Sequence, residues 1–123
     1  MGAFTVLLVD DDPVILKLLQ VNFEMEGYNV ITANDGVEGL ARARADRPDI
    51  VLLDIMMPRM DGLEVTRALK GDADTRSIPI ILLSAKAQLS DVQQGRDMGA
   101  DDYLTKPFDP LELLDRVGQL LAR

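Results

Sequence analysis

A chain of 123 residues, 47% of them apolar, has the size of one domain with a single hydrophobic core, so we expect residues 1–123 to form one domain. Its net charge of −8 would repel nucleic-acid phosphates and anionic membrane surfaces, which argues against direct binding of this chain to either. The chain contains no cysteine and no histidine, which excludes disulfides, zinc sites built from thiolate or imidazole, and nucleophiles activated by histidine.

Short apolar runs recur along the chain and predict β-strands. In chain order they are Phe4–Val9, Asn29–Ala33, Ile50–Leu53, Ile80–Leu83 and Asp102–Thr105. The first, third and fourth are almost uninterrupted, which is typical of strands covered on both faces.

Between these runs the apolar residues recur with the period of an α-helix, and each stripe is expected to face the core. In chain order the stripes are Val14, Leu18, Val21 and Met25; Val37, Leu40 and Ala41; Val65, Ala68 and Leu69; Val92, Gly95 and Met98; and Leu111, Leu114, Val117 and Leu121. Capping and stop signals predict the boundaries: Asp12-Pro13 and Gly27 for the first helix, Asp35 and Arg47-Pro48 for the second, Gly71 for the end of the third, and Ser90 or an earlier residue for the start of the fourth.

The regular alternation of strand and helix predicts an α/β domain with a parallel sheet, helices on both faces and right-handed crossovers. We expect a doubly wound, five-stranded (βα)5 fold of the flavodoxin-like type. The strand order 2-1-3-4-5 is taken from known folds of this class, because the sequence pattern alone does not give it.

Polar side chains follow four of the predicted strands, at the edge where an open α/β sheet binds ligands. They are Asp10, Asp11 and Asp12 after the first strand, Asp54 after the third, Ser84 after the fourth and Lys106 after the fifth. The order 2-1-3-4-5 places these strands side by side with Asp54 in the middle. Asp12 alone is read as a helix N-cap, because Pro13 follows it.

Two carboxylates about 4 Å apart repel by roughly 4 kcal/mol at an effective dielectric near 20, so a cluster of Asp10, Asp11 and Asp54 requires cations. Lys106 can balance one charge, and a divalent metal would balance the others. A ligand set made only of oxygen favours Mg²⁺, with Mn²⁺ as an alternative, over zinc. An aspartate beside such a metal can attack phosphorus to give an acyl phosphate.

Four segments of the chain, VLLVDDDP, LLDIMMPRMDG, IILLSAKA and GADDYLTKPF, resemble the receiver domains of two-component response regulators in sequence and in order. The resemblance covers essentially the whole chain. It implies a phosphorelay signalling switch that accepts a phosphoryl group on Asp54 from a phosphohistidine of a partner. Such a domain catalyses its own phosphorylation and dephosphorylation, and it is not a conventional enzyme.

The resemblance also implies a role for each residue of the cluster. Asp11 would bind Mg²⁺ directly, Asp10 would hold it through water, and Asp54 and the Met56 backbone carbonyl would complete the protein ligands. Two further residues, Ser84 and Lys106, would contact the phosphoryl group. Tyr103 would be an aromatic switch that turns inward once Ser84 moves toward the phosphate, and Lys106-Pro107 would be a cis peptide.

The partners implied by the resemblance are a sensor histidine kinase or a histidine phosphotransfer protein, and a downstream output protein or domain. The output surface would be the face formed by the fourth helix, fifth strand and fifth helix. A cytoplasmic location is expected, because no apolar run reaches the roughly 20 residues that span a bilayer.

The sequence leaves open whether the chain is a monomer or forms a phosphorylation-dependent dimer. Asp102 and Arg116 match one charged pair of the dimers that winged-helix response regulators form. At two other positions, Val92 and Gly118 replace the basic residues that are usual in that class. Asp97 and Glu112 therefore lack the basic partners expected in such a dimer.

Three other interpretations account for part of the pattern. A phosphatase with an aspartyl nucleophile would carry a second Asp two residues after Asp54, where this chain has Met56. An FMN carrier would need hydroxyls and amide donors after the first strand, where residues 10–12 would repel the phosphate. A degenerate receiver would never take phosphate and would serve only as an interaction module, but the complete set of polar strand-end residues argues against it.

Overall fold

The structure is a computed structural model that describes residues 3–85 and 89–122, with the backbone alone for residues 89–91. Strands and helices alternate along the chain as predicted. Their bounds are β1 (Thr5–Val9), α1 (Pro13–Met25), β2 (Asn29–Ala33), α2 (Gly36–Asp46), β3 (Ile50–Asp54), α3 (Gly62–Lys70), β4 (Ile80–Ser84), α4 (Leu89–Asp97), β5 (Asp102–Thr105) and α5 (Pro110–Leu121). Among the helices in the described part of the chain, none has the length and apolar character needed to cross a membrane.

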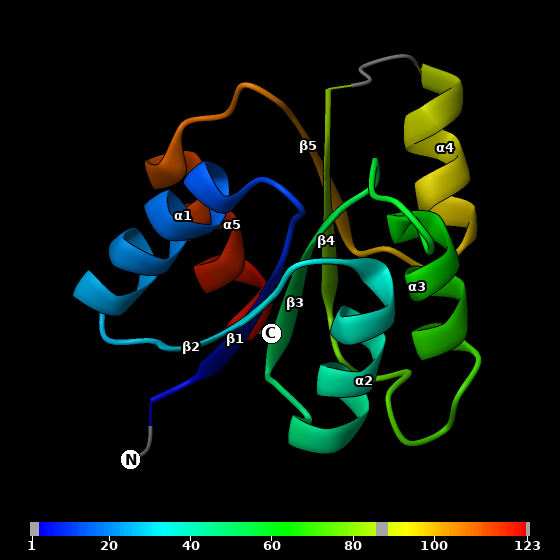
Figure 1. Cartoon of the computed structure of the whole chain (residues 1–123), viewed down its shortest axis with the longest axis horizontal. Coiled ribbons are helices and arrows are strands. Elements are labelled where there is room, and N and C mark those ends of the chain that lie inside the picture. The colour runs from blue at the N-terminus through cyan, green and yellow to red at the C-terminus, as the bar shows by residue number, and fades with distance from the viewer. Residues whose placement is uncertain (1–2, 86–88, 123) are drawn as a thin grey trace.

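The strands form one sheet of order β2-β1-β3-β4-β5, in which every neighbouring pair is parallel (Figure 1). This confirms the predicted fold class and strand order. The register pairs Val9 with Leu53 and Ser84 with Thr105. The carboxyl ends of β1, β3, β4 and β5 therefore lie at the same edge of the sheet.

Helices cover both faces of the sheet, with α1 and α5 on one side and α2, α3 and α4 on the other (Figure 1). The side that carries α1 and α5 buries Phe23 and Val117 against Leu8 and Leu52. On the opposite side, α2 and α3 pack with the strands through residues that include Ala43, Val65 and Leu69. β3 and β4 are buried along their whole length, as their apolar runs predicted.

The predicted inward face of α1 is wrong. Its stripe, Val14, Leu18, Val21 and Met25, is 42% to 80% exposed, and the helix buries Leu16, Leu19 and Phe23 instead. Apolar residues occur on more than one face of α1, so their spacing alone does not predict which face is buried. Burial of the face that carries Leu16, Leu19 and Phe23 places the large Phe23 side chain in the core, and this removes more apolar surface from water than burial of Val14 or Val21 would.

Two other stripes are wrong in part. Val37 of α2 is 52% exposed, and the helix instead buries Gly36, Gly39 and Ala43. A Cβ on Gly39 would lie 2.8 Å from the Val9 side chain, so this glycine lets the helix approach β1 closely. Leu111 of α5 is 68% exposed, whereas Leu113 and Val117 are buried.

The predicted helix boundaries hold wherever the structure describes them. Asp12, Asp35, Asp61 and Asp109 each accept a hydrogen bond from a backbone amide in the first turn of α1, α2, α3 and α5. Gly27 follows α1 with a φ of 91°, a left-handed conformation that suits glycine. The expected cap at Ser90 belongs to a stretch whose side chains lie outside the described residues.

The buried face of α1 can be tested with a matched pair of substitutions. Leu19→Ala should lower the free energy of unfolding by about 2–5 kcal/mol because it opens a cavity in the core. Leu18→Ala, on the outward face, should cost less than about 1 kcal/mol. Urea unfolding of both variants measures the difference, and equal losses would contradict the assigned face.

Candidate functional site

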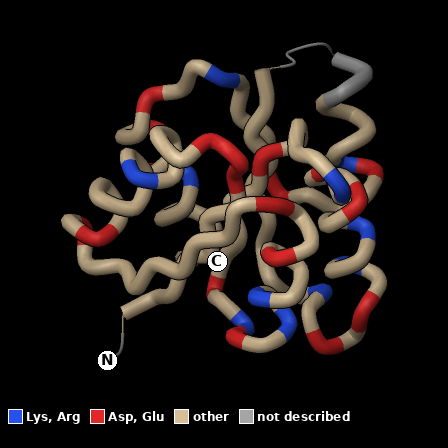
Figure 2. Tube along the Cα trace, in the orientation of Figure 1, with Lys and Arg blue, Asp and Glu red and all other residues tan. Residues whose placement is uncertain are grey.

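Acidic side chains from β1 and β3 meet at the carboxyl edge of the sheet. Carboxylate oxygens of Asp10, Asp11 and Asp54 all lie within 4.8 Å of one another. Asp10 and Asp54 are only 2% and 4% exposed, whereas Asp11 faces solvent. Figure 2 shows acidic segments from separate parts of the chain meeting near the middle of the molecule. The predicted carboxylate cluster is thus present in the structure.

Lys106, which follows β5, supplies a cation to this cluster. Its Nζ lies 2.9 Å from Oδ2 of Asp10 and 3.4 Å from Oδ1 of Asp54. One ammonium faces three carboxylates, so the group remains negative. Burial alone would lower the pKa of Lys106, but its contacts with Asp10 and Asp54 outweigh burial and raise that pKa.

The electrostatics of Asp54 differ from those of an ordinary aspartate. Burial, together with the negative charge of Asp10, raises the pKa of Asp54 from 3.8 to about 6. Lys106 and the backbone amide of Met56 oppose this effect, because both stabilise the ionised carboxylate. The site therefore favours a further cation beside Asp54 at neutral pH.

Local backbone geometry holds two of the carboxylates in place. Asp10 accepts a hydrogen bond of 2.9 Å from the amide of Asp12, which in turn caps α1 through Val14. Asp12 is therefore the helix cap that its sequence context predicted. Asp54 ends β3, and the amide of the next residue, Ile55, still donates to the carbonyl of Leu83 on β4 at 3.0 Å.

Gly62 is a supporting residue that the sequence did not reveal. Its amide donates to the Ile55 carbonyl at 3.0 Å, and a Cβ placed on Gly62 would lie 2.8 Å from the Ile55 Cα and closer still to the Asp54 carbonyl oxygen. Only glycine fits here without displacing the backbone of Asp54. The Asp61-Gly62 pair gives no such signal in the sequence, where it reads as an ordinary helix start.

Ser84 and Lys106 are brought together by the pairing of β4 with β5. Ser84 is fully buried at the end of β4, opposite Thr105, and its carbonyl accepts a 2.7 Å hydrogen bond from the Lys106 amide. The Lys106-Pro107 peptide is cis, as the resemblance implied.

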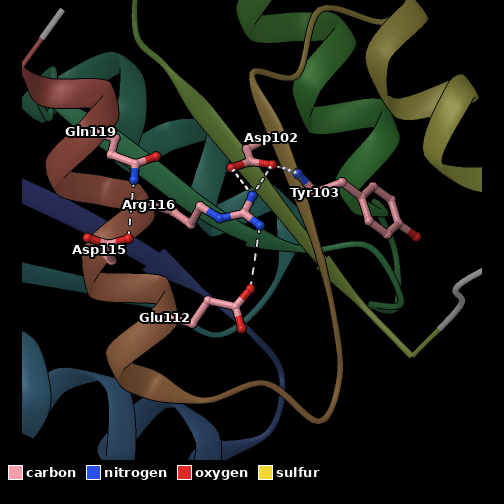
Figure 3. A network of polar contacts seen from close by, with 6 residues as sticks. All are labelled: Asp102, Tyr103, Glu112, Asp115, Arg116 and Gln119. Atoms are coloured by element: carbon pink, nitrogen blue, oxygen red, sulfur yellow. Dashed lines mark hydrogen bonds and ion pairs between the residues drawn. The ribbon is translucent and has the colours of Figure 1, made fainter.

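A cavity of about 450 Å³ opens beside the cluster, and three predicted site residues line it. They are Asp11, Met56 and Tyr103, and Gln94 of α4 also contributes to the wall. Tyr103 is half-buried and projects from β5 toward α4, on the opposite side of the sheet from Asp102 and α5 (Figure 3). The predicted switch residue thus lies near the acidic cluster without belonging to it.

These residues suit a hard cation. The donors are all oxygen, two carboxylates are buried, and Asp11 leaves one side open to solvent, as Mg²⁺ requires when it keeps several waters. When bound, Mg²⁺ would neutralise the cluster and draw a phosphoryl oxygen toward Asp54.

Comparison with known proteins identifies the family. Residues 6–118 match the family model described as the response regulator receiver domain. The chain belongs to this family. Among curated proteins, the receiver is 49% identical over 118 residues to the DNA-binding dual master transcriptional regulator RpaA of Synechocystis sp.. This match covers 96% of this chain and 49% of RpaA. This chain spans about half the length of the curated relatives it matches.

Solved structures support the same assignment. A putative response regulator from Chloroflexus aurantiacus superposes with a TM-score of 0.93 at 35% identity, over 99% of this chain and 100% of that one. The receiver domain of sensor histidine kinase PA1611 from Pseudomonas aeruginosa has a TM-score of 0.91 at 31% identity, over 99% and 100% of the two chains. That structure holds a magnesium ion coordinated in its active site cleft, and it supports a Mg²⁺ site at the acidic cluster of this receiver.

Asp54→Asn should stabilise the metal-free receiver, because it removes one of three converging carboxylates while Lys106 keeps Asp10 as a partner. The pKa of Asp54 rises from 3.8 to about 6 on folding, so the contribution of Asp54 to wild-type stability is most favourable below pH 3.8 and is lost as the pH rises through about 6. At pH 8 the variant should therefore gain about 1–3 kcal/mol in unfolding free energy.

Urea unfolding at two pH values checks this expectation. At pH 5 the gain should be roughly half as large, because much of Asp54 is then protonated in the folded state. Saturating Mg²⁺ at pH 8 should also reduce the gain. If the difference in unfolding free energy between Asp54→Asn and the wild type changes with neither pH nor Mg²⁺, repulsion among the carboxylates is not its cause.

Proposed function

We propose that this receiver accepts a phosphoryl group on Asp54 in a Mg²⁺-dependent reaction and that the phosphorylated form signals to an output partner. The observation that carries the proposal is the position of Asp54. Its carboxylate is buried, lies 3.4 Å from the Lys106 ammonium, and shares the end of the sheet with two more carboxylates. This arrangement fits a nucleophile that meets an anionic phosphoryl group only when cations are present.

The donor proposed is a phosphohistidine on a sensor histidine kinase or a histidine phosphotransfer protein. An Asp54 carboxylate oxygen forms a bond to phosphorus while the phosphorus–nitrogen bond breaks, and the electron pair of that bond stays on the imidazole. Lys106 would stabilise charge on the phosphoryl oxygens, and the Ser84 hydroxyl would contact one of them. Hydrolysis of the acyl phosphate would return Asp54, so the domain acts on itself and is not a conventional enzyme.

The metal ligands proposed are the carboxylates of Asp10, Asp11 and Asp54 with the backbone carbonyl of Met56. Asp11, the exposed member, is the one we expect to bind Mg²⁺ directly, and Asp10 would hold it through water. Mn²⁺ would serve as a substitute, because it prefers the same oxygen ligands.

An apolar groove suggests where the donor docks. A cavity of about 380 Å³ beside the site is lined by Ile15, Leu18, Ala85, Lys106, Pro107 and Phe108. A protein that brings its phosphohistidine to Asp54 must cover the mouth of the site next to Lys106. We therefore propose that the donor packs against this groove and the adjoining outward face of α1, in the cytoplasm.

The output surface proposed is the face of α4, β5 and α5, which Tyr103 would couple to the phosphoryl site. On this face Arg116 binds Asp102 of its own chain through two contacts of 2.9 and 2.7 Å, and its other terminal nitrogen lies 3.5 Å from Glu112 (Figure 3). A dimer that used the Asp102 and Arg116 pair between chains would first have to break these contacts. Monomer and phosphorylation-dependent dimer both stay open as proposals.

Labelling with a small phosphodonor tests the acceptor. After treatment with acetyl phosphate and Mg²⁺, intact-mass spectrometry should find one added phosphoryl group on the wild type and none on Asp54→Ala. Asp74→Ala is the matched control, because the Asp74 side chain is 73% exposed and does not belong to the cluster. Labelling of Asp54→Ala at the wild-type level would overturn the proposal.

The degenerate-receiver alternative has its own readout in the same samples. Beryllofluoride with Mg²⁺ imitates a phosphoryl group, so it should shift the NMR resonances of residues near Asp54 and of Tyr103. If it shifts neither, the chain is an interaction module that takes no phosphate.

Lys106→Ala separates phosphoryl stabilisation from metal binding. Loss of the ammonium should slow acetyl phosphate labelling about 10- to 100-fold, because a donor to the phosphoryl oxygens is gone. Mg²⁺ affinity should not fall, since the carboxylates lose a competing cation. Calorimetric Mg²⁺ titration and labelling rates measure both, with the exposed Lys17→Ala as control. Weaker Mg²⁺ binding in Lys106→Ala would contradict the assigned role.

A further inference from the structure

The segment that follows Asp54 rests against the start of α2. Residues 55–61 connect Asp54 to α3, and the backbone of Met60 in this loop lies directly over Gly36, the first residue of α2. A Cβ placed on Gly36 would lie 2.8 Å from the Met60 carbonyl carbon, and closer still to its oxygen. Because the obstacle is backbone, no side chain at position 36 fits unless the loop or the helix moves.

A charged contact joins the same two segments. Oδ2 of Asp35 lies 3.5 Å from Nη1 of Arg59, and Asp35 also caps α2 by accepting a 2.8 Å hydrogen bond from the Glu38 amide. Arg59 has a φ of 68° and its side chain is 73% exposed. Exposed ion pairs contribute little, so the close fit of Gly36 on Met60 is the main contact and the ion pair an addition to it.

The loop has little slack between this contact and the acidic cluster. The Met60 amide donates to the Pro58 carbonyl at 2.8 Å, and the Met57 amide donates to the Ile55 carbonyl at 3.1 Å. At the near end, the Met56 amide bonds the Asp54 carboxylate. Each of these bonds closes a tight turn in the short stretch between Met56 and Met60. We therefore expect a shift of Met60 to move Met56 as well.

We propose that Asp35 and Gly36 are positioning residues for the phosphoryl-acceptor site. They hold residues 59 and 60 against α2, and so set where Met56 lies relative to Asp54 and the metal ligands. This inference rests on the function proposed above. It differs from a purely structural role, in which the contact would stabilise α2 and the loop without affecting Mg²⁺ binding.

Gly36→Ala tests the inference in the whole chain. Mg²⁺ binding, followed by calorimetry and by the amide resonance of Met56, should weaken about 10-fold, as is typical when support of a metal ligand is disturbed. The Mg²⁺ concentration needed for half-maximal acetyl phosphate labelling should rise by a similar factor, with a smaller change at saturating Mg²⁺.

Gly118→Ala is the matched control, because it adds a Cβ to an exposed helical glycine with no neighbouring atom within 4 Å. It should leave Mg²⁺ affinity unchanged. If Gly36→Ala lowers thermal stability but binds Mg²⁺ as tightly as Gly118→Ala, the contact is only structural and the inference is wrong.

Milder variants decide the matter if Gly36→Ala does not fold. Asp35→Asn keeps an oxygen that can cap α2 but removes the charge facing Arg59, and Arg59→Gln removes the other charge. Each should weaken Mg²⁺ binding about twofold, the scale of an exposed ion pair. Unchanged affinity in both would overturn the inference. Failure of the wild type to bind Mg²⁺ or to accept phosphate would instead reject the proposed function.

Discussion

Repulsion among Asp10, Asp11 and Asp54 is the constraint on which the site depends. The parallel register of β1 and β3 brings these carboxylates together, and two of them are almost completely buried. Lys106, which lies 96 residues after Asp10 in the sequence but contacts its carboxylate, offsets part of the negative charge. The fold thus maintains an arrangement that is unfavourable until a further cation arrives, which makes the site responsive to metal and to phosphate.

Sheet topology explains how this arrangement is possible. In the order β2-β1-β3-β4-β5, the strand that carries Asp54 has the acidic end of β1 on one side and the end of β4 on the other. Ser84 is held there by pairing with β5, and the same pairing delivers Lys106. Each group reaches the site at or next to a strand end, where hydrogen bonds to the neighbouring strands fix the backbone. Placement of the charges therefore depends on the sheet more than on loop conformation.

The sequence predicted the strands, the carboxylate cluster and most helix caps, because these follow from local patterns and from the rule that parallel strands end together. It did not predict which side of α1 is buried, since the exposed Val14 and Val21 repeat with the same spacing as the buried Leu16 and Phe23. It also did not reveal Gly36 or Gly62 as supports of the site. Their importance lies in backbone segments that approach each other from different parts of the chain, and no spacing within the sequence encodes that distance.

The two apolar sides of α1 have an evolutionary consequence. Leu16, Leu19 and Phe23 pack in the core and hold the helix to the sheet. Val14, Val21 and Met25 are exposed and are not part of the core. Mutations on the outer side can accumulate with little cost in unfolding free energy. After gene duplication, this side of α1 could therefore change and recognise a different partner while the phosphorylation site stays the same. Paralogous receivers could in this way acquire different partners and keep the same chemistry.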